Sequence, residues 1–342
     1  MIKFRQILGL NMFRILENSK KRAIFLSLVV GFLIMSIKFL AYYTTGSSAI
    51  LTDASESIVN VIAAAFAFYS LYLAEQPKDE NHPYGHGKIE FFSSGLEGVL
   101  IMMAGILTIV PAIWNLLISQ KPIENILDGI YLIIVTILVN GLLGLYLIKT
   151  GKATSSIVLE ADGKHLLVDS VSSFILLAGL FLVKFTGIYY LDSVVAIGLA
   201  IFIMVSGYKI ARKSIGGLMD ETDFDMLDKL IDILKINRKD RWIDIHNFRV
   251  KKYGADIHID CHLTLPYYLN LEESHDEVSA LENILKENLD AELEIFIHSD
   301  PCIPQCCHYC RISNCAVRKS DFDREVIWNK QTLITDQKHI EY

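Results

Sequence analysis

The sequence predicts a membrane protein in which six transmembrane helices precede a small soluble α+β domain. The 342 residues are 52% hydrophobic and have a mean hydropathy of +0.37, which is too apolar for a soluble domain with a charged surface. Charges are also uneven: long windows between Ala23 and Ile210 nearly lack them, and the region from Lys213 to Tyr342 is rich in them. The chain is therefore expected to have a membrane part and a soluble part.

Six windows are apolar over the roughly 20 residues that a helix needs to cross a bilayer. They cover residues 23–43, 49–75, 91–118, 128–149, 157–184 and 190–210. Six crossings return both termini to one side. Every loop on that side carries basic residues, whereas the opposite loops hold only Lys121 and Lys184. We therefore expect a multi-pass protein of a prokaryotic plasma or inner membrane with both termini in the cytoplasm.

The soluble half has the pattern of an α-β-β-α-β domain. Apolar residues follow a helical spacing at 223–234 and 273–288, and strand patterns cover 242–252, 255–265 and 292–298. This order favours two layers, with helices on one face of a mainly antiparallel sheet.

Four parts of the chain follow from these patterns. They are a basic amphipathic segment at the membrane surface (1–22), the transmembrane domain (23–212), the cytoplasmic α+β domain (213–301), and a Cys-rich segment with a polar tail (302–342). The net charge of -7 and the lack of a clustered basic face argue against nucleic acid as a partner. All six cysteines lie in the soluble half, where a reducing cytoplasm keeps them as thiols available to metal.

Two apolar windows each carry ligand-type side chains four residues apart. The pairs are Glu56 with Asn60 and His165 with Asp169, and residues spaced in this way share one helix face. Together the pairs predict a four-ligand cage suited to Zn²⁺ and acceptable to Mn²⁺, Fe²⁺ or Co²⁺. Two carboxylates cancel the charge of a divalent ion. In the empty cage the two anions would repel each other, so protons are the expected exchange partner.

Alternatives for these intramembrane groups remain. Polar pairs can simply hold helices together, although ionisable residues at membrane depth usually mark a pathway. Asp53 and Asp162 share the same helix faces as the predicted ligands, and for them a role in the entry path and a role as a helix cap or water-facing group are both open.

The loop between the second and third windows holds a second ligand group. Asp79, His82 and His86 supply a carboxylate and two imidazoles, which is enough for a three-ligand metal site. The alternative is a polar turn whose histidines cap the third helix.

Four stretches together resemble the cation diffusion facilitator family. They are Thr52–Asn60, Asp79–Lys88, Ala161–Asp169 and Ile297–Pro301, and the likeness extends over roughly residues 20 to 302. The resemblance implies a homodimer of six-helix protomers in the lipid bilayer, each with a cytoplasmic ferredoxin-like domain of metallochaperone type. It also implies export of Zn²⁺ or a related ion in exchange for protons by alternating access.

The resemblance further implies which soluble residues bind metal. The loop ligands would be the three residues already named. In the α+β domain, His246, His262 and Asp300 would hold one structural or regulatory ion, while His275 and His298 would hold a second with Asp300 bridging.

The second transmembrane window departs from the family pattern. Family members usually have His or Asp followed four residues later by Asp, whereas this chain has Glu56 and Asn60. An amide oxygen is a harder and weaker ligand, which leaves Mn²⁺, Fe²⁺, Co²⁺ and Cd²⁺ open beside Zn²⁺.

A Cys-rich segment follows the region of resemblance. Five cysteines and His308 fall between Cys302 and Cys315. They suggest a thiolate zinc site made from Cys306 or Cys307 with Cys302, Cys310 and Cys315. The alternatives are an ordinary reduced surface segment or redox-sensitive thiols.

Taken together, the sequence predicts a proton-coupled exporter of divalent transition metals. A membrane-anchored metal sensor without transport is the alternative, but a sensor would not need ligands at membrane depth on two helices. An enzyme is not expected, because the sequence shows no nucleophile–base pair and no cofactor loop.

Overall fold

The computed structural model describes residues 18–45, 48–117, 127–186, 190–254, 256–289 and 293–340. Most of the expected N-terminal amphipathic segment therefore lies outside the described residues. The chain divides into two compact units, Met1–Leu218 and Met219–Tyr342.

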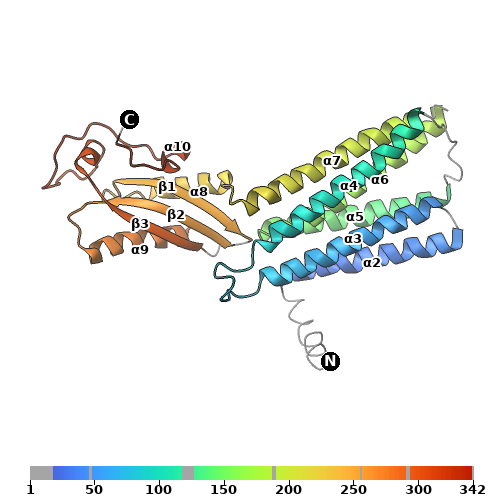
Figure 1. The fold of residues 1–342 in the computed structure, drawn as a ribbon, viewed down its shortest axis with the longest axis horizontal. Helices are drawn as coiled ribbons and strands as arrows, with labels where there is room; N and C mark the ends of the chain where they lie inside the picture. Colours follow the sequence, from blue (N-terminus) through green and yellow to red (C-terminus); the bar gives the residue numbers. More distant parts are fainter. Residues whose placement is uncertain are drawn as a thin grey trace, which may run out of the picture. The chain divides into compact units, whose positions relative to one another are not determined.

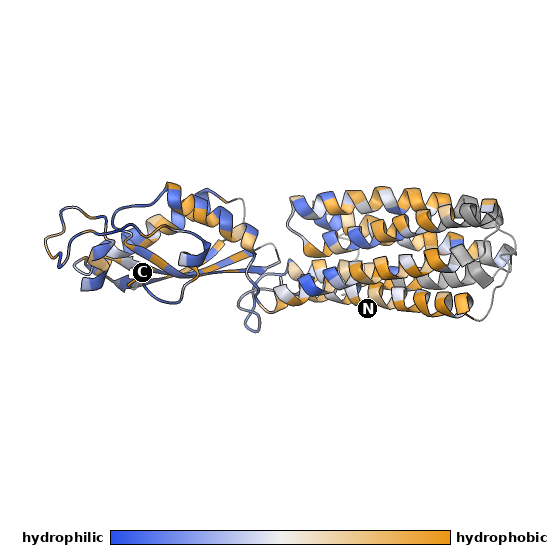
Figure 2. Cartoon of the chain, turned by 90° about the horizontal axis from the view of Figure 1, so that it is seen from above, coloured by the Kyte–Doolittle hydropathy of each residue, from blue (hydrophilic) through white to orange (hydrophobic). Residues whose placement is uncertain are grey.

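Among its described residues, the first unit contains six long helices (Figure 1). They are α2 (Ser19–Thr45), α3 (Ser48–Ala74), α4 (Ile89–Leu117), α5 (Leu127–Ala153), α6 (Ile157–Thr186) and α7 (Tyr190–Leu218). Each covers one of the six apolar windows. Among the described residues, four segments are long and apolar enough to cross a membrane, namely Ser19–Leu40, Ile89–Trp114, Ile134–Ala153 and Ser193–Leu218. Apolar residues dominate the helices in Figure 2, as lipid contact requires.

Glycines allow two helix pairs to approach closely. Between α4 and α7, a Cβ added to Gly98 would lie 2.6 Å from the backbone nitrogen of Ala211 and 2.8 Å from the carbonyl oxygen of Gly207. Between α5 and α6, a Cβ on Gly144 would lie 2.8 Å from the carbonyl oxygen of Gly163. Small residues at such contacts let helices pack backbone to backbone in a membrane.

The second unit has the predicted order α-β-β-α-β. Its elements are α8 (Phe224–Ile236), β1 (Asp244–Tyr253), β2 (Asp256–Leu265), α9 (Leu271–Glu287) and β3 (Leu293–Pro301). The sheet order is β1-β2-β3, with β1 antiparallel and β3 parallel to β2. The expected mainly antiparallel sheet is thus mixed, because a helical crossover through α9 brings the chain back in the same direction.

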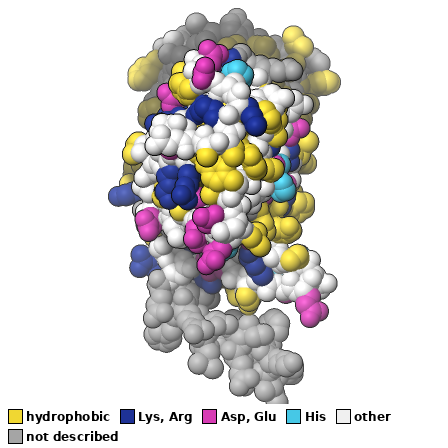
Figure 3. Space-filling view, turned by 90° about the vertical axis from the view of Figure 1, so that its left-hand side faces the viewer, with side chains coloured by type: hydrophobic (Ala, Val, Ile, Leu, Met, Phe, Trp, Pro, Cys, Tyr) yellow, Lys and Arg dark blue, Asp and Glu magenta, His cyan; other side chains and the backbone are white. Residues whose placement is uncertain are grey.

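The residues after Pro301 pack onto this domain. They form the short 3-10 helix η1 (Pro304–His308) and the four-residue helix α10 (Lys330–Leu333). Tyr309, Trp328 and Leu333 are buried in the same core as the leucines of α8 and α9. On the face shown in Figure 3, basic and acidic side chains are scattered beside exposed hydrophobic ones.

The close contact of α4 with α7 predicts that substitution by alanine lowers the melting temperature much more at one glycine than at another. We expect Gly98→Ala to lower the melting temperature of the protein in detergent, because the new methyl group would overlap the α7 backbone at a cost of about 1–3 kcal/mol. Gly198→Ala is the matched control, since a Cβ there meets nothing within 4 Å. Equal melting temperatures for the two variants would contradict the packing of this pair.

Candidate metal sites

Three of the four residues predicted to form the intramembrane cage come together in the structure. Asn60 on α3 donates from Nδ2 to Asp169 Oδ2 on α6 over 3.4 Å. His165 Nε2 lies 3.4 Å from the same carboxylate oxygen. The side chains of Glu56 and Asp53 lie outside the described residues. The i, i+4 spacing on α6 therefore places imidazole and carboxylate on one face, toward α3.

His165 fits a metal-ligand role by its surroundings. Both ring nitrogens are buried; Nε2 faces the Asp169 carboxylate at 3.4 Å, and Nδ1 has no hydrogen-bond partner among the described residues. Leaving a buried polar atom without a partner costs free energy. A metal ion bound at one nitrogen would supply the missing interaction, so the donor chemistry of this position suits a cation.

Two further buried carboxylates adjoin the cage. Asp162 is 5% exposed and accepts a 2.7 Å hydrogen bond from Ser27 on α2. It lies in the second turn of α6, so it caps neither end of that helix. Glu97 on α4 is 6% exposed and interacts electrostatically with Asp162, His165 and Asp169. The group thus draws on helices α2, α3, α4 and α6.

Glu97 was not among the site residues predicted from the sequence. It had no ligand-type partner three or four residues away, so the pairing pattern that revealed His165 and Asp169 did not apply. A lone acidic residue in an apolar window was the signal that could have identified it.

The loop residues Asp79, His82 and His86 form a compact group. Asp79 Oδ1 lies 3.0 Å from His82 Nδ1, and Asp79 Oδ2 lies 3.3 Å from His86 Nε2. One ligand atom from each lies within 4.8 Å of the others. Nearby Gly85 adopts a φ of +86°, which favours glycine in this turn. His86 Nδ1 is buried without a hydrogen-bond partner, so this atom caps no backbone N–H of α4.

The carboxyl group of Asp79 stays ionised within this group. Desolvation opposes ionisation, but hydrogen bonds from the backbone and ring of His82 and the charges of both histidines hold the pKa of Asp79 below its ordinary value. An ionised carboxylate beside two imidazoles is a ligand set typical of transition metals.

In the α+β domain, strand register aligns three histidines across the sheet. His246 on β1 pairs with His262 on β2, and His262 pairs with His298 on β3. Asp300 follows two residues after His298 and therefore points to the same face. Its Oδ2 lies 3.2 Å from His262 Nδ1 and 3.4 Å from His246 Nε2, while Oδ1 lies 3.6 Å from His298 Nε2.

Asp300 is thus the centre of the domain site. His246, His262 and Asp300 place one ligand atom each within 4.8 Å of one another. Burial lowers the pKa of His246 despite the nearby Asp244 and Asp300 carboxylates, which keeps this imidazole neutral and able to bind metal. His275 lies exposed on α9 and is not part of this group in the described residues.

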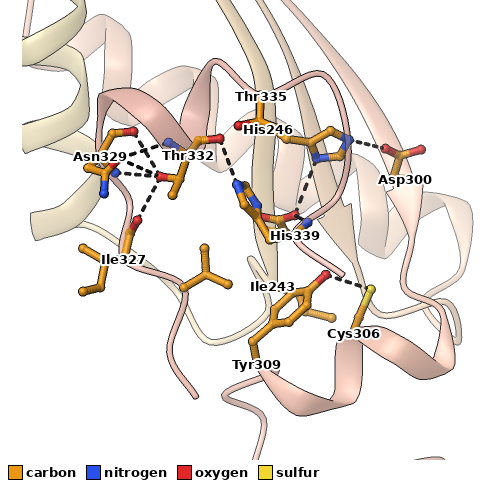
Figure 4. A network of polar contacts seen from close by, with 12 residues as sticks. Ile243, His246, Asp300, Cys306, Tyr309, Ile327, Asn329, Thr332, Thr335 and His339 are labelled. Carbon is orange, nitrogen blue, oxygen red and sulfur yellow. Dashed lines mark hydrogen bonds and ion pairs between the residues drawn. The ribbon is translucent and has the colours of Figure 1, made fainter. Parts of the chain in front are cut away.

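The C-terminal segment supplies neighbours of this site that the sequence did not predict (Figure 4). His339 Nδ1 lies 2.8 Å from Asp244 Oδ1, and His339 Nε2 lies 2.9 Å from the Thr332 carbonyl oxygen. Asp244 Oδ2 in turn lies 3.7 Å from His246 Nδ1. Lys338 Nζ lies 3.8 Å from Asp300 Oδ1. These residues had no recognisable pattern in the sequence.

The cysteines divide into two groups. Cys261 is 2% exposed on β2, and burial raises the pKa of its thiol to about 12, so it remains protonated. The other five, Cys302, Cys306, Cys307, Cys310 and Cys315, line one cavity of about 240 Å³ at the start of the C-terminal segment. All six are free thiols.

Comparison with known proteins agrees with both domains. Residues 24–219 match the cation efflux transmembrane domain, and residues 226–302 match the cytoplasmic domain of cation efflux proteins. The chain is 32% identical to an uncharacterized transporter of Synechocystis, over 81% of this chain and 88% of that protein.

Two relatives carry names that state an activity. One is the cation-efflux pump FieF of Shewanella oneidensis, 28% identical over 80% of this chain and 92% of that protein. The other is the manganese efflux system protein MneP of Bacillus subtilis, 22% identical over 83% of this chain and 97% of that protein. With matches to both of its domains, the chain belongs to the cation diffusion facilitator family of membrane transporters, which move metal cations out of the cell.

Proposed function

We propose that the chain exports a divalent transition-metal ion from the cytoplasm in exchange for protons, by alternating access, with Zn²⁺ as the first candidate. The supporting observation is His165, whose buried Nδ1 has no hydrogen-bond partner among the described residues and whose Nε2 lies 3.4 Å from the Asp169 carboxylate. A buried imidazole beside a carboxylate and an amide is suited to binding a cation.

The metal preference follows from the ligand types. One imidazole nitrogen with the oxygens of Asn60, Asp169 and the proposed ligand Glu56 makes a mixed site. Imidazole suits Zn²⁺ and Fe²⁺, while carboxylate and amide oxygens also suit Mn²⁺. Mn²⁺, Fe²⁺, Co²⁺ and Cd²⁺ are therefore the competing substrates, and a relative named for manganese efflux supports testing Mn²⁺ first among them.

Proton exchange follows from the charge of the empty site. Glu97, Asp162 and Asp169 gather around one imidazole. When a divalent ion leaves, its positive charge leaves with it, and unbalanced anions at membrane depth are unfavourable. Protons from the opposite side of the membrane can bind the site and replace that charge. When the site again faces the cytoplasm, it releases these protons and binds the next metal ion.

The α+β domain is proposed as a cytoplasmic metal-binding and dimerisation module. Its site would hold one ion through His246, His262 and Asp300. The domain family that it matches is named for a dimer. β3 is one of the two edge strands of the described sheet, and Phe296 on it is 55% exposed, which offers an apolar contact for a second protomer.

Removal of the shared carboxylate tests the transport site. We expect Asp169→Asn to reduce metal uptake at least about 100-fold in proteoliposomes with an imposed pH gradient, because the charge that faces His165 and the ion is lost. Thr108→Val is the control, since Thr108 is exposed on α4 and bonds only within its own helix in the structure. Unchanged uptake by Asp169→Asn would overturn the site, and metal binding without uptake in the unaltered protein would favour a sensor.

Adding a carboxylate at Asn60 tests the ligand role of the amide. In Asn60→Asp, a second anion would face Asp169 where the amide now donates over 3.4 Å. We expect the KM for Zn²⁺ at neutral pH to fall by about tenfold, equivalent to about 1.4 kcal/mol, and to rise more steeply on acidification as protons compete for the added group. A KM and a pH profile equal to those of the unaltered protein would exclude Asn60 from the site.

The domain site predicts a difference between two of its candidate ligands. We expect Asp300→Asn to remove most of the Zn²⁺-dependent rise in melting temperature of the full chain, because Asp300 contacts all three aligned histidines. His275→Ala should retain the ion bound by His246, His262 and Asp300. If His275→Ala lost as much stabilisation as Asp300→Asn, the three-residue assignment would be wrong.

A further inference from the structure

The cavity lined by cysteines lies outside the transport machinery, and most of its lining residues follow the matched family domains. The cytoplasmic family domain ends at residue 302, whereas four of the five cysteines that line the cavity follow that position. Nothing in the proposed transport cycle uses these thiols. Five cysteines around one cavity of about 240 Å³ therefore need a separate explanation.

The chemistry of the cavity is soft and apolar. Its walls include Ile243, Tyr267, Tyr268, Ile303 and Ile312 beside the thiols. Carboxylates are not among its described lining residues, and His308 is not one of them either. Sulfur ligands without oxygen ligands select Zn²⁺ or iron–sulfur clusters over Mg²⁺, Ca²⁺ and Mn²⁺.

Hydrogen bonds to sulfur distinguish the cysteines from one another. Burial raises the pKa values of the Cys302 and Cys310 thiols, and the backbone N–H groups of Tyr267 and Ile312 act against this rise. The backbone N–H of Lys319 donates to Cys307 Sγ over 3.4 Å. Backbone N–H groups aimed at sulfur stabilise negative charge there, as second-shell contacts do for metal-bound thiolates.

Cys306 has a different environment. It is 1% exposed within the hydrophobic core. Its Sγ accepts a 3.2 Å hydrogen bond from the hydroxyl group of buried Tyr309 (Figure 4). Cys306 is therefore assigned to the core, and Cys307 is chosen from this adjacent pair. Cys302, Cys307, Cys310 and Cys315 then make a set with spacing C-x₄-C-x₂-C-x₄-C.

Positive charge lies beside this set. Arg318 donates to the carbonyl oxygens of Cys307 at 2.9 Å, Cys310 at 2.9 Å and Ile312 at 2.7 Å, which closes the segment into a loop. Lys319 is one of the residues lining the cavity. Four thiolates around one Zn²⁺, or around a cluster of charge +2, carry a net charge of about -2. These two cations offset that charge.

We propose that Cys302, Cys307, Cys310 and Cys315 bind a thiolate metal centre, either a single Zn²⁺ ion or an iron–sulfur cluster, that fastens the C-terminal segment to the α+β domain. Each thiol releases its proton to solvent on binding. For a four-iron cluster of charge +2, the components supplied are two Fe²⁺, two Fe³⁺ and four sulfide ions, so that no electron is transferred on assembly. The fastened segment carries Lys338 and His339, which contact Asp300 and Asp244, so the centre stabilises the outer shell of the His/Asp site.

The two forms of the centre differ in the distance between sulfurs. A single Zn²⁺ with Zn–S bonds of about 2.3 Å holds its four sulfurs about 3.8 Å apart, while a cluster holds each sulfur on a different iron and farther apart. Among the described residues, no three of the cavity thiols lie within 4.8 Å of one another. Zn²⁺ would therefore draw the loop inward on binding.

The test uses the full chain purified in detergent, without oxygen, from cells supplied with zinc and iron. Zinc, iron and acid-labile sulfide are quantified per protomer after EDTA has removed weakly held metal, and absorbance near 400 nm is recorded. Single substitutions Cys310→Ser and Cys315→Ser are compared with Cys306→Ser and Cys261→Ser, which lie outside the proposed set.

We expect the unaltered protein to retain either about one zinc more than Cys310→Ser and Cys315→Ser, or about four irons with sulfide and visible absorbance that both variants lose. Cys306→Ser and Cys261→Ser should retain the centre. Maleimide labelling of the unaltered protein, which needs no variant, should find the four thiols protected until the metal is stripped. A metal-free unaltered protein with all four thiols labelled at once, or loss of the centre in Cys306→Ser, would overturn the proposal.

Zinc uptake by the same variants in proteoliposomes separates this proposal from the transport function. Cys310→Ser should lose the centre and still transport, because its thiol lies outside the intramembrane site. Failure of Asp169→Asn to reduce uptake would bear on the transport site alone.

Discussion

The cost of placing ionisable groups at membrane depth governs the first unit of this protein. Asp169, Asp162 and Glu97 could not persist there as isolated charges. The structure gathers them around His165 and gives them partners from other helices, through Asn60 on α3 and Ser27 on α2. Such a group forms only if the helices approach closely, and glycines at two helix contacts permit that approach. The close packing of the helices and the grouping of the acidic side chains around His165 are therefore both consequences of the cost of charge at membrane depth.

In the α+β domain, the arrangement of the candidate ligands depends on the sheet, which brings them together as the helix bundle does in the first unit. Register sets His246, His262 and His298 side by side on neighbouring strands, and the two-residue repeat of β3 adds Asp300 to the same face. The buried 2.8 Å hydrogen bond between His339 Nδ1 and Asp244 Oδ1 then holds the C-terminal segment beside His246. A segment without regular secondary structure thereby becomes part of the surroundings of the site.

The metal groups of the chain differ in ligand chemistry. The intramembrane, loop and sheet groups combine imidazole with oxygen groups, a ligand set that would bind borderline metals and could release them. The cavity of the C-terminal segment offers sulfur in an apolar setting, where a bound metal would be retained. A transporter that must release its substrate and also hold a structural metal would need such a division, because ligands that bind tightly make poor carriers.

The sequence by itself determined the six helices, the α-β-β-α-β order and the pairing of His165 with Asp169. All of these depend on local periodicity, in which apolar windows, strand alternation and i, i+4 spacing can be read without knowledge of distant contacts. The roles of Asp244 and His339 could not be predicted from the sequence, because each acquires its role from residues far away in the chain. The parallel placement of β3 and the distinction between Cys306 and Cys307 were likewise decided only by the tertiary structure, since adjacent residues of one type differ only in what the fold packs against them.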